Sequence, residues 1–161
     1  PARGSPGQDR LSCRSDQADA AGRSVEAVAV KPRLKYLLDT HAFLWAATDE
    51  DRLGAEAARV LAVTPYEQLA ISDVTLQEVG LLMQSGKISF SGNPATVLGH
   101  LLDYVQVLPI SLPVVIAAPA LKLPHSDQFD RVITATAKVH RLTLITKDAN
   151  ITDAGIVTTV W

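Results

Sequence analysis

The sequence predicts an α/β fold of three layers (α/β/α), in which helices cover both faces of a central, mainly parallel sheet. From residue 34 onward, short apolar runs typical of buried strands alternate with helical segments of about ten residues, which is the pattern of successive β-α-β units. A chain of 161 residues is long enough for one ordinary domain, and its 47% hydrophobic content allows a sizeable core. Acidic residues at the ends of the strands indicate where a site would lie.

The predicted strands are short runs rich in Leu, Ile, Val and Thr, bounded by polar or turn-forming residues. The first is built on Tyr36-Leu37-Leu38, directly before an aspartate. The strands are expected at residues 35–39, 69–72, 105–110, 142–146 and 156–160. Because the segments between them are helical, neighbouring strands are expected to run parallel.

Helices are predicted where apolar residues recur with helical spacing between these strands. Asn93-Pro94 has the form of an N-cap followed by proline at the first helical position, and Gly86 lies where a helix is expected to stop. Pro119 is expected to kink the helix that contains it. The helices are expected at residues 40–47, 54–62, 74–84, 94–104, 113–121 and 129–140.

Residues 1–33 differ in composition from the rest of the chain, and we interpret them as a disordered N-terminal extension to a domain at 34–161. They are rich in Pro, Gly, Ser, Arg, Asp and Gln and contain no aromatic residue, so they cannot bury enough surface to offset their ordering entropy. The domain has thirteen acidic and nine basic residues. A nucleic-acid binder usually shows the opposite balance, but a nuclease remains compatible because bound cations offset clustered acids.

Cysteine usage and hydropathy restrict the remaining classes. Cys13 is the only cysteine, which excludes a disulfide framework and a thiolate metal cluster and fits a reducing cytoplasm. The sequence contains no run of 18 or more apolar residues, so no membrane span is predicted. The first thirty residues lack the apolar region of a secretory signal. A cytoplasmic protein without a membrane partner is expected.

Four carboxylates occupy positions where a strand or turn gives way to a helix or loop. Asp39 closes the first strand, Asp148 follows strand 142–146, Glu78 lies shortly after strand 69–72, and Asp130 opens a helix. Because the carboxyl ends of parallel strands line one crevice, the four acids are expected to meet there. They would repel one another by several kcal/mol unless a cation lay among them. The pattern therefore predicts a divalent metal site, and the metal suggests phosphate chemistry.

Each acid also has a structural explanation when it is considered alone. Asp39 and Asp127 are placed to cap helices, and Asp148 is placed to shape a turn at 147–150. Thr75 and Glu78 have the spacing of a capping box. The occurrence of all the acids in one predicted crevice favours the metal site over these separate explanations.

Four segments carry the acids: Tyr-Leu-Leu-Asp-Thr-His-Ala-Phe-Leu-Trp at 36–45, Ser-Asp-Val-Thr-Leu-Gln-Glu-Val at 72–79, Leu-Pro-His-Ser-Asp-Gln-Phe-Asp-Arg at 123–131, and Leu-Ile-Thr-Lys-Asp at 144–148. In order and spacing they resemble the motifs of PIN-domain nucleases, specifically the VapC-like toxins of bacterial toxin–antitoxin pairs. The resemblance covers about residues 34–161. It departs at Gln128, where this subgroup often has proline, and all the acids are still present.

The resemblance implies a PIN-like fold and a metal-dependent endoribonuclease that leaves 5′-phosphate and 3′-hydroxyl ends. It implies that Asp39, Glu78, Asp130 and Asp148 hold one or two Mg²⁺ or Mn²⁺ ions. It also implies a homodimer silenced by a small VapB-like antitoxin, which often aims a basic side chain at the acids.

Secondary roles are expected for a few neighbours of the acids. Thr40 and Thr146 are candidates for hydrogen bonds to a carboxylate or to a metal-bound water, and Asp127 is a further candidate that we interpret chiefly as a helix cap. Arg131 is the strongest of four basic candidates for phosphate contacts because it adjoins Asp130; the others are Lys138, Arg141 and Lys147.

Two other function classes remain open from the residues alone. A metal-dependent phosphotransfer domain also gathers acids at strand ends, but a dehalogenase-type phosphatase needs aspartate at position 41, which is histidine, and a receiver needs an acid pair at the first strand. A non-catalytic PIN-fold binding module has no need of four acids. Nothing in the sequence distinguishes RNA from DNA as substrate.

Overall fold

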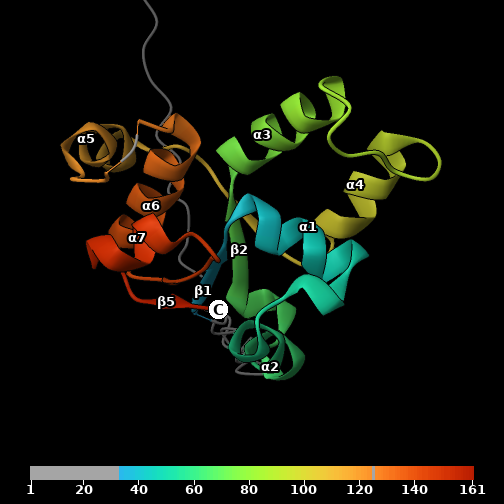
Figure 1. Cartoon of the computed structure of the whole chain (residues 1–161), viewed down its shortest axis with the longest axis horizontal. Coiled ribbons are helices and arrows are strands. Elements are labelled where there is room, and N and C mark those ends of the chain that lie inside the picture. The colour runs from blue at the N-terminus through green and yellow to red at the C-terminus, as the bar shows by residue number, and fades with distance from the viewer. Residues whose placement is uncertain (1–32, 125) are drawn as a thin grey trace, which may run out of the picture. The chain divides into compact units, whose positions relative to one another are not determined.

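The computed structural model describes residues 33–124 and 126–161 (Figure 1), so the extension expected at 1–33 lies outside the described residues apart from Arg33. Within these residues, five strands form one parallel sheet in the order β3-β2-β1-β4-β5. The strands are β1 Tyr36–Leu38, β2 Leu69–Ser72, β3 Gln106–Leu108, β4 Thr143–Ile145 and β5 Thr159–Val160. The predicted central parallel sheet is confirmed.

Helices connect each strand to the next. They are α1 Thr40–Thr48, α2 Ala55–Val63, α3 Asp73–Gln84, α4 Pro94–Leu102, α5 Leu112–Ala120, α6 Gln128–His140 and α7 Ala149–Ala154, with 3₁₀ turns η1 Glu50–Arg52 and η2 Tyr66–Gln68. Asn93 caps α4 as predicted, since its Oδ1 accepts from the backbone N–H groups of Ala95 and Thr96. In the described part of the chain, no helix is both long and apolar enough to cross a membrane.

Alternate residues of the strands pack into two separate cores, one on each face of the sheet. Leu37 and Leu144 pack with buried residues of α5, α6 and α7, while Leu38 and Ile145 pack with residues of α1 and α2. Figure 1 shows α5, α6 and α7 gathered on one side of β1, with α1 and α4 on the other. The three-layer arrangement is therefore as predicted.

The C-terminal part of the chain differs most from the prediction. The segment from Ala149 forms α7 where a simple turn was expected, and Asp148 is the N-cap of that helix. Gly155 ends α7 with φ of +62°, in the left-handed region that glycine adopts without strain. The last strand therefore begins only at Thr159 instead of residue 156, because the chain first has to leave the helix.

The strand order reverses between β1 and β4. The chain runs from β1 outward through β2 to β3, then returns to the opposite side of β1 for β4 and β5. Leu38 is paired with Ile145, so Asp39 and Thr146 both follow directly at the carboxyl ends of neighbouring strands. In open α/β sheets ligands bind at such a switch point, which identifies this edge as the place to examine for a site.

Candidate active site

Thr146 joins the acids that follow β1 and β4. Its hydroxyl donates to Asp39 Oδ2 at 2.6 Å and accepts from the backbone N–H of Asp148 at 3.1 Å. Asp39 Oδ1 accepts from the backbone N–H of His41 at 3.0 Å, which also makes Asp39 the N-cap of α1. Asp39 is only 6% exposed. Both oxygens of this buried carboxylate are therefore held by neutral donors, which fix its position without cancelling its charge.

Glu78 reaches the same place from α3. Its Oε2 accepts from the Thr40 hydroxyl at 2.5 Å, a contact between α3 and the start of α1. The capping-box explanation for Glu78 is wrong, because α3 begins at Asp73 and Thr75 is already inside the helix. The Thr75 hydroxyl is buried without a hydrogen-bond partner. Glu78 is thus tied to the site by Thr40, across 38 residues of chain.

Helix α6 brings the remaining acids. Asp127 caps the helix, with Oδ1 accepting from the backbone N–H groups of Phe129 at 2.8 Å and Asp130 at 3.4 Å. Asp130 lies in the first turn of α6 and is half-buried. The cap fixes the start of the helix and with it the position of Asp130.

One pocket of about 330 Å³ is lined by all four predicted acids. Its lining consists of Asp39, His41, Glu78, Asp127, Asp130, Lys147, Asp148 and Ala149. A neighbouring hollow of about 490 Å³ continues from it, since Glu78 and Asp127 line both, and Phe129 lies in that second hollow. The acids therefore converge on one crevice at the carboxyl edge of the sheet, and we name it the acid pocket.

Crowding of the acids is visible in their protonation equilibria. Burial, followed by the negative charges of Asp127, Asp39, Asp148 and Glu78, raises the pKa of Asp130 from the ordinary 3.8 to about 7. Burial also raises the pKa of Glu78; the hydrogen bond from Thr40 opposes that rise and the charge of Asp39 adds to it. The pocket thus disfavours full ionisation of its own carboxylates, a condition that a bound divalent cation relieves.

The raised pKa of Asp130 predicts how the stability of the metal-free protein depends on pH. An aspartate whose pKa is raised in the folded state gives no penalty below about pH 4; the penalty grows as the pH rises from about 4 to about 7 and stays constant above that. We expect the free energy of unfolding of Asp130→Asn, relative to that of wild type, to increase by about 1–2 kcal/mol between pH 4 and pH 8, a value reduced for the partial exposure of the carboxyl group. Urea unfolding in EDTA at both pH values measures this difference. A difference that is independent of pH would contradict the crowding of the acids.

The donor set fits a divalent cation in its chemistry. Among the described residues, no three acidic, histidine or cysteine side chains stand close enough together to hold one ion directly in their present positions. Mg²⁺ keeps several of its waters and commonly binds through one or two carboxylates, so it does not need a closed cage of protein oxygens. Four hard oxygen donors that repel one another around a single pocket are compatible with Mg²⁺ or Mn²⁺.

Of the basic residues that were candidates for phosphate contacts, Lys147 lines the acid pocket and Arg131 does not. The Arg131 Nη1 donates to the carbonyl oxygen of Leu121 at 2.8 Å, which ties the guanidinium to the end of α5. A phosphate contact by Arg131 stays a prediction. Among residues 33–124 and 126–161, Lys147 is the lysine or arginine that lines the acid pocket.

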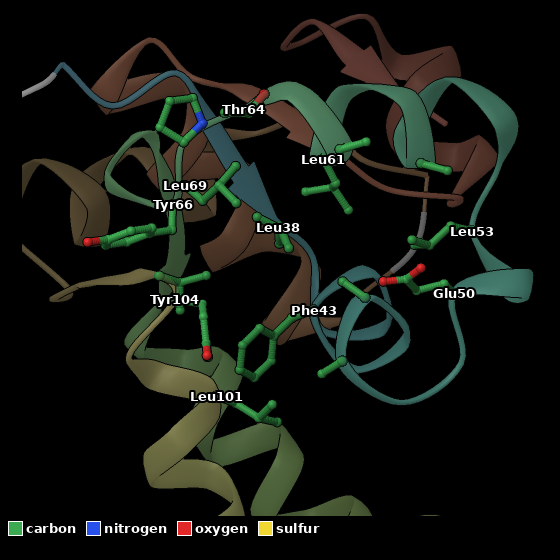
Figure 2. A pocket seen from close by; sticks show the side chains of 16 residues that line it. Leu38, Phe43, Glu50, Leu53, Leu61, Thr64, Tyr66, Leu69, Leu101 and Tyr104 are labelled. Atoms are coloured by element: carbon green, nitrogen blue, oxygen red, sulfur yellow. The ribbon is translucent and has the colours of Figure 1, made fainter.

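A larger hollow of about 630 Å³ (Figure 2) shares helix α1 with the acid pocket. It is bordered by α1, α2, η2 and the end of α4, and Phe43, Leu61 and Leu101 point into it in the figure. Tyr66 and Tyr104 stand at its border and are 52% and 64% exposed. Helix α1 connects the two places, since its N-cap is Asp39 and its Phe43 side chain lines the hollow.

Comparison with known proteins agrees with this architecture. The family model described as PIN domain matches residues 36–157. Ribonuclease VapC22 of Mycobacterium tuberculosis is 32% identical over 115 residues, which are 70% of this chain and 85% of that protein.

Solved structures share the fold over most of the domain. A toxin–antitoxin complex from Klebsiella pneumoniae has a chain that is 28% identical, with a TM-score of 0.57 over 79% of this chain and 97% of that chain. VapBC2 of Rickettsia felis, solved bound to a DNA fragment from its promoter, has a TM-score of 0.60 over 79% of this chain and 98% of that chain, at 17% identity. This chain therefore belongs to the PIN-domain family and is one of its VapC-like members.

Proposed function

We propose that the protein is a Mg²⁺- or Mn²⁺-dependent endoribonuclease and the toxin of a toxin–antitoxin pair. The observation that carries the proposal is the convergence of Asp39, Glu78, Asp130 and Asp148 on one pocket at the switch point of the sheet. The similarity to Ribonuclease VapC22 supports RNA as the substrate. Growth inhibition would follow from cleavage of an RNA needed for translation in the cytoplasm.

The chain's own residues have separable tasks in this proposal. Asp39, Glu78, Asp130 and Asp148 would hold the ion, and when bound it would lower the pKa of a coordinated water and stabilise charge on the phosphate oxygens. Thr146 and Thr40 orient two of these carboxylates through the hydrogen bonds described above. Asp127 fixes the first turn of α6, and thereby Asp130.

A small VapB-like antitoxin is the proposed partner. Similar solved structures are VapBC complexes, and the acidic pocket suits a basic side chain from such a partner. The apolar hollow of Figure 2 supplies a second contact, because apolar side chains of a partner helix would fit between α1, α2 and α4. Binding at both places would cover the acids while anchoring the inhibitor beside them.

A homodimer is also proposed. Helix α5 exposes Leu112, Val115 and Ile116 at helical spacing, with 71%, 54% and 66% of their surfaces accessible. An apolar stripe of this kind on the surface of a protein is usually covered by a partner. We expect a second copy to cover it, which sedimentation of the isolated protein at several concentrations would measure.

Incubation of the purified protein with structured and unstructured RNAs tests the proposed activity. The reactions contain Mg²⁺, Mn²⁺ or EDTA, and the product ends are identified by ligation and phosphatase sensitivity. We expect internal cleavage that requires a divalent ion and leaves 5′-phosphate ends. Products with 2′,3′-cyclic phosphate, or cleavage that persists in EDTA, would contradict hydrolysis by a metal site.

The same reactions separate the proposal from its alternatives. Turnover of acetyl phosphate or a phosphomonoester without RNA cleavage would favour a phosphotransfer enzyme. A protein that neither cleaves nucleic acid nor binds a divalent ion would be a binding module on a PIN fold. Single-stranded DNA serves as a parallel substrate, because cleavage of DNA and RNA at equal rates would remove the assignment to RNA.

A further inference from the structure

Two cationic side chains share the indole of Trp45, and one of them, Lys147, lines the acid pocket. The Lys147 Nζ lies 4.3 Å from the centroid of the Trp45 ring, and the Arg52 guanidinium carbon also lies 4.3 Å from it. Lys147 follows β4 and Arg52 ends η1, so the indole on α1 brings together segments that are far apart in the sequence. The two charges are consequently held as neighbours.

The indole holds these charges in place without neutralising them. A cation over an aromatic face is attracted by the ring quadrupole and keeps its full charge, whereas a carboxylate partner would cancel it. Within residues 33–124 and 126–161, the partner found for the Lys147 ammonium is this indole, although Asp39, Asp130 and Asp148 line the same pocket. Arg52 is 4.0 Å from Asp49 and its side chain is 57% exposed. Lys147 therefore remains available to an anion, and the pair of Arg52 with Asp49 is exposed enough for an anion to compete with it.

The platform under the cations is itself held firmly. Trp45 is 7% exposed, and its ring is 5.8 Å from that of Trp161 and 5.5 Å from that of His41. Trp161 packs so closely on Gly54 that a Cβ at position 54 would overlap it. The position of the indole is thus fixed by packing against Trp161 and His41.

We propose that Lys147 and Arg52 form a phosphate-binding rim that receives the backbone of single-stranded RNA beside the acid pocket, with Trp45 as the positioning residue. The inference rests on the proposed function, because the acids require a substrate strand that passes next to Lys147. An anionic backbone approaching four carboxylates needs cations at the edge of the pocket, and Lys147 lines the pocket. Arg52 shares the indole with Lys147, so a strand that contacts Lys147 is expected to reach the second charge as well.

Binding measurements in an inactive background test the rim separately from catalysis. Asp39→Asn is combined with Lys147→Gln, Arg52→Gln or both, and the affinity for a fluorescein-labelled single-stranded RNA of mixed sequence is measured across a salt series. Removal of each cation is expected to reduce the slope of log K against log salt by about 0.7 and to weaken binding about fivefold at low salt. Lys147→Arg is expected to restore binding, since arginine also stacks on an indole.

Matched controls remove one charge elsewhere. Lys35→Gln changes an exposed lysine just before β1, at the opposite edge of the sheet, and Arg59→Gln changes an arginine already paired with Glu56. Both are expected to keep the salt slope. Trp45→Leu tests the platform: it should weaken binding when Lys147 and Arg52 are present and have no further effect when both are glutamine. Circular dichroism and the thermal midpoint verify that each variant is folded.

The outcomes separate the rim from the proposed function. Unchanged slopes for Lys147→Gln and Arg52→Gln, together with cleavage of RNA by the wild-type protein, would overturn the rim alone. Equal effects of the Lys35→Gln and Arg59→Gln controls would also overturn it, because the effect would then be one of net charge. Absence of RNA binding in the Asp39→Asn parent, with no cleavage by wild type, would overturn both the rim and the ribonuclease.

Discussion

Asp39→Asn is expected to abolish RNA cleavage, with a decrease of about a thousandfold or more, while the protein remains folded. Asparagine keeps the shape of the side chain and can still accept from His41 N–H, but it lacks the charge that a divalent ion requires. Initial rates of cleavage in Mg²⁺ and in Mn²⁺ measure the effect. Asp39 directly follows β1 and accepts a hydrogen bond from Thr146, so its substitution removes a carboxylate whose position is fixed.

Asp73→Asn is the matched control for this substitution. Asp73 also follows a strand at the carboxyl edge of the sheet, but its Oδ2 accepts from the backbone N–H of Ile110 at 2.9 Å and it does not line the acid pocket. We expect Asp73→Asn to cleave within about threefold of the wild-type rate, because Asp73 lies outside the acid pocket. Equal rates for Asp39→Asn and wild type would rule out the proposed chemistry.

Thr146→Val is expected to lower the cleavage rate by about 10- to 100-fold, as removal of a group that orients a ligand usually does. Valine has nearly the same shape as threonine but leaves Asp39 Oδ2 without its donor and the Asp148 N–H without its acceptor. Thr146 is 1% exposed, so water cannot readily replace these bonds, and we expect the free energy of unfolding to fall by about 1–3 kcal/mol. Steady-state kinetics and urea unfolding of the same preparations measure both effects.

Two further variants identify the hydroxyl as the cause. Thr146→Ser restores it and is expected to recover most of the activity. Thr134→Val removes a hydroxyl that is buried on α6 without a hydrogen-bond partner, so it is expected to be neutral or slightly stabilising and to leave cleavage unchanged. If Thr146→Val behaved like Thr134→Val, the link between β1 and β4 would not matter for catalysis.

The sheet and the grouping of the acids followed from local sequence because both depend on strand direction. β2 has the predicted bounds, 69–72, since its four residues are all buried and apolar or small. Once the strands are parallel, residues such as Asp39 and Thr146 must lie together at one edge. Other strands were predicted too long, as at 156–160, because apolar residues also occur outside the sheet.

Features that depend on tertiary contacts were not predictable. Helix α7 has only six residues, too few for a periodic pattern, and was expected to be a turn. The capping-box spacing of Thr75 and Glu78 was misleading because the start of α3 is set by β2 and not by Thr75. The contact of Lys147 with Trp45 joins residues about a hundred positions apart, so no local pattern records it.

Calorimetric titration of Mn²⁺ into the metal-free protein is the most direct test of the central claim that four carboxylates at the switch point form one metal site. It requires no knowledge of the RNA target. We predict saturable binding of Mn²⁺ that Mg²⁺ can displace. Asp39→Asn and Asp130→Asn should each weaken this binding at least about tenfold, and Asp73→Asn should leave it unchanged. Binding that is absent, or that is equal in all four proteins, would contradict the metal site and with it the proposed nuclease.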